Sequence, residues 1–100
     1  MILDVTQADI DESTRRMRPL AAYSASCDCP IAVALARTSG VSRDDVNVGH
    51  SSLDVYAGPK LRRYRPTKAL LAFMRAYDCE KRPAPRRFAL LALQPRWGGS

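Results

Sequence analysis

The chain has 100 residues, which suits one domain and leaves no room for two. Its hydrophobic content of 46% and charged content of 26% are ordinary for a globular protein and exclude disorder of the whole chain. The net charge of +6 favours an anionic partner such as nucleic acid, a membrane surface or an acidic protein. A solvated basic surface with no dedicated ligand is the simpler alternative.

The sequence predicts a cytoplasmic protein. No window approaches the ~20 apolar residues that a membrane span needs. The first residues, Met1 to Thr6, lack the basic and long apolar regions of a signal peptide. The cysteines number 3, which is odd and too few for a disulfide scaffold.

The N-terminal quarter predicts one strand, one helical turn and a long loop. Ile2–Val5 is apolar and β-branched, as strands are. Thr6 and Asp9 have the spacing of a capping box, which predicts a single helical turn over Gln7–Glu12. Residues 13–28 show no periodicity and predict an exposed loop; loops of that length are either functional or disordered.

A helix and a hairpin follow. Pro30 suits the first position of a helix and Gly40 suits its C-terminal stop. Val46–Val48 and Leu53–Ala57 alternate apolar and polar residues around a turn at 49–52, which predicts a β-hairpin.

A further strand and the clearest helix come next. Lys60–Arg65 reads as a strand that ends at Pro66, and Thr67 is a suitable N-cap. The helix after it has one apolar stripe with helical spacing and extends to about Arg82; the stripe comprises Leu70, Phe73, Met74 and Tyr77.

The last predicted element is a strand over Arg87–Leu93, ended by Pro95, and residues 96–100 are a tail. The sequence thus predicts a single α+β domain over 1–95, a small sheet with two helices. The order β-α-β-β-α-β is that of a ferredoxin-like unit. The expected core comprises Leu3, Val5, Ile31, Leu35, Val55, Leu70, Phe73, Met74, Tyr77, Phe88 and Leu90.

The cysteines and the histidine are the residues with chemical potential. A thiolate of Cys29 at a helix N-terminus would be stabilised and reactive. Cys27, Cys29, His50 and Cys79 could together bind a metal, but the C-x-C spacing is wrong for zinc. The simpler interpretation is favoured: the cysteine is a small buried residue under the helix, because buried cysteine is common and inert. We therefore expect no metal, no cofactor and no essential thiol.

No catalytic motif stands out. His50 lies near Ser51, Ser52 and Asp54, but neighbouring strand residues point to opposite faces, so they do not form a local triad. No glycine-rich phosphate loop is present. We expect a protein that is not an enzyme.

The densest basic run, 60–68, supplies the candidate contact residues: Lys60, Arg62, Arg63, Tyr64, Arg65 and Lys68. Arg62 and Tyr64 would share one face of the strand, and Arg63 and Arg65 the other. If Leu61 faces inward, Arg63 and Arg65 start inward too, which predicts an edge strand whose charges block aggregation. The alternative is a functional contact surface.

Several short motifs resemble those of small uncharacterised accessory proteins from phages and integrated elements of GC-rich bacteria. The similar segments span most of the chain: 5–10, 29–37, 46–48, 73–78 and 82–88. The chain departs from that group at 13–28 and at Lys60–Arg65. The resemblance implies a phage-type accessory protein in a bacterial host, and it carries over no activity.

Two functions remain open. The first is non-catalytic binding to a host or defence protein, as an anti-defence or anti-CRISPR-like inhibitor. The second is nucleic-acid binding through the basic segment 60–68, because the interleaved Tyr64 is typical of such surfaces. The sequence identifies neither the partner nor the oligomeric state.

Overall fold

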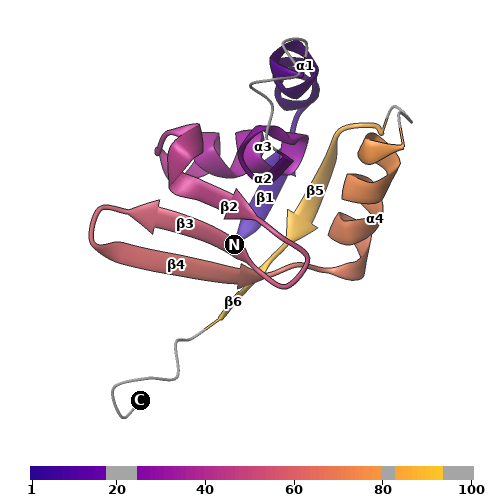
Figure 1. Ribbon diagram of the computed structural model, residues 1–100. Helices are drawn as coiled ribbons and strands as arrows, with labels where there is room; N and C mark the ends of the chain where they lie inside the picture. The colour runs from indigo at the N-terminus through magenta and orange to yellow at the C-terminus, as the bar shows by residue number, and fades with distance from the viewer. Residues whose placement is uncertain (18–24, 80–82, 94–100) are drawn as a thin grey trace.

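The computed structural model describes residues 1–17, 25–79 and 83–93, and it is an α+β domain, as predicted (Figure 1). The predicted tail, 96–100, lies outside the described residues. The helical elements are α1 (Gln7–Arg16), α2 (Ala25–Asp28), α3 (Pro30–Ser39), the 3-10 turn η2 (Arg43–Asp45) and α4 (Lys68–Asp78). The strands are β1 (Ile2–Val5), β2 (Val46–Val48), β3 (Leu53–Ala57), β4 (Lys60–Arg65), β5 (Arg86–Ala89) and β6 (Leu91–Leu93).

The strands form two antiparallel sheets. β1 pairs with β5 in a two-stranded sheet, and the second sheet has four strands in the order β2-β3-β4-β6. The pairings do not by themselves establish the ferredoxin-like arrangement. What they establish is a sheet built mostly from one meander, β2 to β4, whose last strand comes from the C-terminal end of the chain.

The N-terminal capping box is confirmed, but the helix after it is longer than one turn. Thr6 accepts a hydrogen bond from the Asp9 amide, and the Asp9 carboxylate accepts one from the Thr6 amide. The helix then continues to Arg16, and α2 occupies Ala25–Asp28, so the prediction of a loop over 13–28 is wrong at both ends. The sequence signal failed there because α1 is mostly polar and its helical period has few apolar residues to reveal it.

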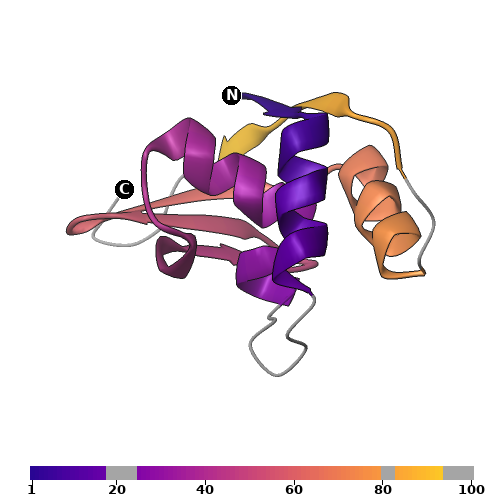
Figure 2. The same cartoon turned by 90° about the horizontal axis from the view of Figure 1, so that it is seen from above.

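Helix α3 is the centre of the molecule. Its first seven residues, Pro30 to Ala36, are all buried, which the small alanine side chains allow. Cys29 caps its N-terminus and Gly40, at φ 71°, ends it in the left-handed conformation that glycine adopts without strain. Figure 2 shows α3 lying over the four-stranded sheet with α1 alongside it.

The predicted core is confirmed. Leu3, Val5, Ile31, Leu35, Val55, Leu70, Phe73, Tyr77, Phe88 and Leu90 are buried in one cluster, and Met74 packs against it half-buried. The Phe73 and Phe88 rings meet edge to face with centroids 5.6 Å apart, which attaches α4 to β5.

The predicted strand over Arg87–Leu93 is two strands. β5 ends at Ala89 and β6 begins at Leu91, and the two belong to different sheets. Between them Leu90 is buried, and its amide and carbonyl both bond to Met1. A continuous apolar run does not reveal where the chain passes from one sheet to the other, because both strands use the same residue types.

Candidate interaction surface

Strand β4 carries most of the predicted contact residues, and it is not a free edge. It pairs with β3 over Lys60–Tyr64 and with β6 at Arg63–Arg65. The prediction that Lys60–Arg65 forms an edge strand is therefore wrong for its second half. It rested on Leu61 facing inward, whereas Leu61 is 44% exposed.

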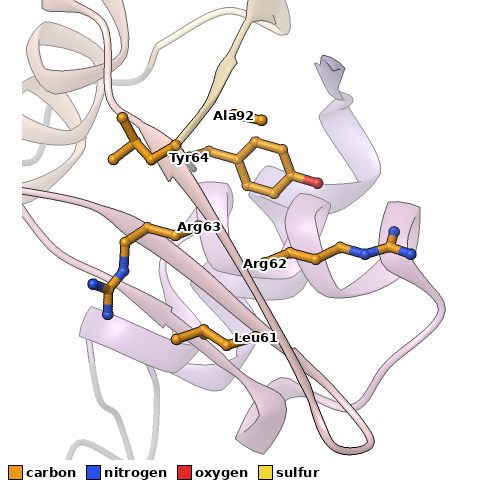
Figure 3. A pocket seen from close by; sticks show the side chains of 6 residues that line it. Leu61, Arg62, Arg63, Tyr64 and Ala92 are labelled. Carbon is orange, nitrogen blue, oxygen red and sulfur yellow. The ribbon is translucent and has the colours of Figure 1, made fainter. Parts of the chain in front are cut away.

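The register of β4 assigns its side chains to two faces of the sheet. Tyr64 and Arg62 lie opposite Leu53 and Val55, which are fully buried, so this inner face is the one that the helices cover. Leu61 and Arg63 lie on the other, outer face. Figure 3 shows this division, with Arg62 and Tyr64 on one side of the strand and Leu61 and Arg63 on the other. The predicted sharing of faces is thus confirmed.

Tyr64 is only partly available for stacking on nucleic-acid bases. It lies on the inner face and packs half-buried against the core cluster. Base stacking needs an aromatic ring that is open on one flat side. Packing against the core leaves less of the Tyr64 ring for a nucleic-acid base.

Arg63 already has an acidic partner. Its guanidinium donates to both carboxylate oxygens of Asp54, at 2.9 and 3.4 Å, and Asp54 is almost fully buried. The pairing raises the pKa of Arg63 further above its ordinary value. This cation neutralises a buried carboxylate of the neighbouring strand, so it is not free for an external phosphate.

The outer face carries an apolar group that sequence analysis missed. Tyr56 lies opposite Leu61, and both are close to half exposed, at 45% and 44%. Leu91 of β6 lies opposite Arg65 and is 64% exposed. Figure 1 shows no described element on this side of the sheet. We call the side formed by Tyr56, Leu61, Arg63, Arg65 and Leu91 the outer face.

The alternation of side chains along β3 already indicated an apolar residue on this outer face. Leu53, Val55 and Ala57 share one side of the strand, which leaves Tyr56 on the other. The edge-strand prediction considered an inward-facing Leu61, and that orientation hides the apolar pair of Tyr56 and Leu61 across β3 and β4.

The remaining predicted contact residues keep their charge free for a partner. Lys60, Arg62, Arg65 and Lys68 are exposed, and within the described ranges none of them forms an ion pair. They do not lie in one row: Lys60 and Arg62 belong to the inner side of β4, Arg65 to the outer side and Lys68 to the first turn of α4.

The cysteines and the histidine do not form a site. Cys29 is buried, Cys79 is exposed, and His50 is an exposed turn residue. Among the residues that the structure describes, no group of His, Cys, Asp or Glu could hold a metal ion. The Cys29 sulfur accepts a hydrogen bond from the Ala32 amide at 3.4 Å and so serves as the cap of α3.

Comparison with known proteins gives no match: no family model, no curated protein and no solved structure matches the chain. Among the described residues, no helix has the length and apolar character required to cross a membrane.

Proposed function

We propose that this protein acts by non-catalytic binding to another protein, through the outer face of the four-stranded sheet. The observation that carries the proposal is the exposed group Tyr56, Leu61 and Leu91 beside Arg63 and Arg65. Exposed apolar residues that gather on one face, rimmed by charged ones, mark interaction sites. Tyrosine and arginine are also the residue types enriched at protein interfaces.

The partner class follows from the resemblance to accessory proteins of phages. In that setting the protein binds a host or defence protein in the bacterial cytoplasm and inhibits it, as an anti-defence or anti-CRISPR-like factor. Such inhibition needs only a surface that blocks the target, which is consistent with a small domain that relies on contact and not on chemistry.

The test compares matched substitutions of exposed apolar residues. Leu61→Asp places a charge in the outer face, whereas Ile2→Asp does the same on β1, in the other sheet, where Ile2 is also exposed. Nuclease-treated lysate of the host is passed over each immobilised protein, after circular dichroism has shown that both variants are folded. We expect the captured protein to be lost with Leu61→Asp and kept with wild type and Ile2→Asp. Equal capture by both variants would contradict the proposal.

Nucleic-acid binding is the second candidate, and four exposed cations that form no ion pair with any described residue favour it: Lys60, Arg62, Arg65 and Lys68. If they contact phosphates, affinity falls with salt at a log–log slope of about −0.7 to −0.9 per contact. We expect only weak binding of DNA and RNA at physiological salt. Submicromolar binding that is abolished by a folded variant with all four residues changed to Ala would make this candidate the better one.

A further inference from the structure

The exposed apolar side chains of the outer face are distributed across three neighbouring strands. Tyr56 of β3 lies opposite Leu61 of β4, and both are close to half exposed. At the other end of β4, Leu91 of β6 lies opposite Arg65 and is 64% exposed. Three neighbouring strands span about 10 Å, and the stretch of β4 from Leu61 to Arg65 spans about 13 Å. The apolar residues thus border an area of about 10 by 13 Å.

An internally neutral ion pair occupies the middle of this area. Arg63 lies on the same side of β4 as Leu61 (Figure 3), and its guanidinium donates to Asp54 at 2.9 Å. The pair adds no net charge to the outer face, because one cation and one nearly buried carboxylate neutralise each other. The methylene stem of arginine is apolar, so Arg63 can contact an apolar partner while its guanidinium stays with Asp54. The middle of the outer face therefore needs no charged group from a partner.

Arg65 gives the outer face its net positive charge. The charged residues on the outer sides of β2, β3, β4 and β6 are Asp54, Arg63 and Arg65. Arg63 is paired with Asp54, whereas Arg65 forms no ion pair with any described residue. A second copy of the chain docked by the same face would bring a second Arg65 and no unpaired carboxylate from these strands, so like charges oppose self-association. A partner that carries carboxylates is therefore favoured.

The dimensions of the area fit one helix better than a second sheet. An α-helix with its side chains is about 10–12 Å across, and about nine of its residues cover the length of the area. A second sheet packed on the outer face would extend over more strands and would cover Asn47, the exposed polar residue on the outer side of β2. Helix-on-sheet packing already occurs in this domain, since α3 lies over the inner face (Figure 2).

We propose that the outer face binds an acidic amphipathic helix of the partner protein. The apolar side of that helix packs on Tyr56, Leu61 and Leu91. A carboxylate on its flank pairs with Arg65. This inference rests on the proposed function, since it names the part of the protein partner that the outer face recognises. Recognition of an amphipathic helix relies on apolar anchors with helical spacing, and charges at the rim of a contact mainly add selectivity.

The probe is the peptide acetyl-Glu-Leu-Ala-Glu-Leu-Leu-Ala-Glu-Leu-Ala-Glu-Leu-amide, whose leucines form one side of a helix and whose glutamates form another. It is titrated into the isotope-labelled full chain and followed by amide chemical shifts. We expect shifts at Tyr56, Leu61 and Leu91 and none at Ile2, which is exposed on the other sheet. The same peptide with Gln in place of each Glu should bind about twofold to fivefold more weakly.

Substitution of Arg65 separates a specific carboxylate contact from general charge attraction. Arg65→Gln should weaken binding of the acidic peptide by about twofold to fivefold and leave binding of the Gln peptide unchanged. Arg75→Gln is the matched control, because Arg75 is an exposed arginine on α4 and its loss changes the net charge by the same amount. It should leave binding of both peptides unchanged. Leu61→Asp should remove binding of both peptides, while the amide shift of remote Ile2 stays as in wild type.

The contrary results overturn the inference in distinguishable ways. Peptide shifts that are absent from the outer face, or an Arg65→Gln variant that weakens both peptides equally, would reject the acidic helix. Nuclear Overhauser contacts between Leu61 and residues 94–100 in the free chain would assign the outer face to the chain's own end. A dimer that Leu61→Asp dissociates in sedimentation equilibrium would assign the outer face to a second copy, and either assignment also rejects the helix. Capture of a host protein that depends on Leu61 but is unchanged by Arg65→Gln would keep the proposed function and reject this inference alone. Capture that Leu61→Asp leaves unchanged would reject the proposed function itself.

Discussion

Cys29 shows how burial changes the chemistry of a helix cap. The helix N-terminus favours a thiolate, and backbone amides of Ala32 and Ile31 act in the same direction. Burial outweighs both and raises the pKa of the thiol to about 11. Burial therefore makes the Cys29 thiol less reactive than an ordinary cysteine. Its sulfur is a protonated group that caps the helix.

The difference in exposure between buried Cys29 and exposed Cys79 predicts selective alkylation of the native protein. At pH 8 the Cys29 thiol is protonated and enclosed, so iodoacetamide should modify exposed Cys79 far faster. Peptide mass spectrometry after timed quenching measures both rates. Unfolding in guanidinium is the control, and it should make the two rates similar. Fast modification of Cys29 in the folded state would show that the cap is open.

Asp9 and Arg37 together join three elements. Besides capping α1, Asp9 accepts bonds from Arg37 of α3 at 3.0 and 2.9 Å, and Arg37 also donates to the carbonyl of Asp4 in β1. Burial raises the pKa of Asp9, but the bonds from Arg37 and Thr6 outweigh it and hold the pKa below its ordinary value.

A depressed pKa makes the contribution of Asp9 dependent on pH in a defined direction. The stabilisation is complete above the unfolded-state pKa of about 3.9 and is lost as pH falls through the lower folded-state value. We expect Asp9→Asn to cost about 1–3 kcal/mol at pH 7. The difference from wild type should shrink below about pH 4, as measured by urea unfolding. A gap that is constant from pH 7 to pH 3 would contradict this assignment.

At the scale of elements, α4 depends on a few side chains for its position. Leu70, Phe73 and Tyr77 are its buried residues, and Phe73 meets Phe88 of β5. Phe73→Ala removes this contact and leaves a cavity, so it should lower the free energy of unfolding by about 3–5 kcal/mol. Chemical denaturation measures the change, with exposed Ala72→Ser as the control. A loss within experimental error would remove Phe73 from the core.

The other end of α4 is attached to α1 by hydroxyl groups. Ser13, fully buried, donates to the Tyr77 hydroxyl at 2.9 Å, and Thr14 lies 3.2 Å from the same atom. Tyr77→Phe leaves the Ser13 hydroxyl without this partner, at a cost of about 1–3 kcal/mol. The double variant Tyr77→Phe with Ser13→Ala should recover part of the loss in the same unfolding assay. If no recovery occurs, the bond is not the cause.

Elements with a local signal were predictable from the sequence, and those that depend on distant pairing were not. The caps at Thr6 and Thr67 and the stop at Gly40 are confirmed, because a cap needs only residues within one turn. The length of α1 and the break at Leu90 were missed. Both depend on packing against segments far along the chain, which a periodic pattern does not encode.

At the scale of the whole molecule, the surroundings of the basic run were not predictable from the sequence. Lys60–Arg65 is exposed, as the basic run suggested. Its pairing with β6 could not be foreseen. The register with β3 decides that Leu61 points outward and that Tyr64 packs partly against the core. Asp54, which pairs with Arg63, was named only as a neighbour of His50, so one of the predicted contact cations has an internal role.

The pairing of β1 with β5 has a consequence for how the protein is made. Met1 bonds Leu90, 89 positions along the chain, so β1 cannot pair with β5 until the residues between the two strands have been synthesised. At ordinary elongation rates of about 5–20 residues per second, Leu3 and Val5 wait roughly 4–18 s for their partners. During that interval the apolar first strand is exposed, and contacts so distant along the chain also slow folding itself. The apolar residues of β1 are therefore open to aggregation until β5 has been synthesised.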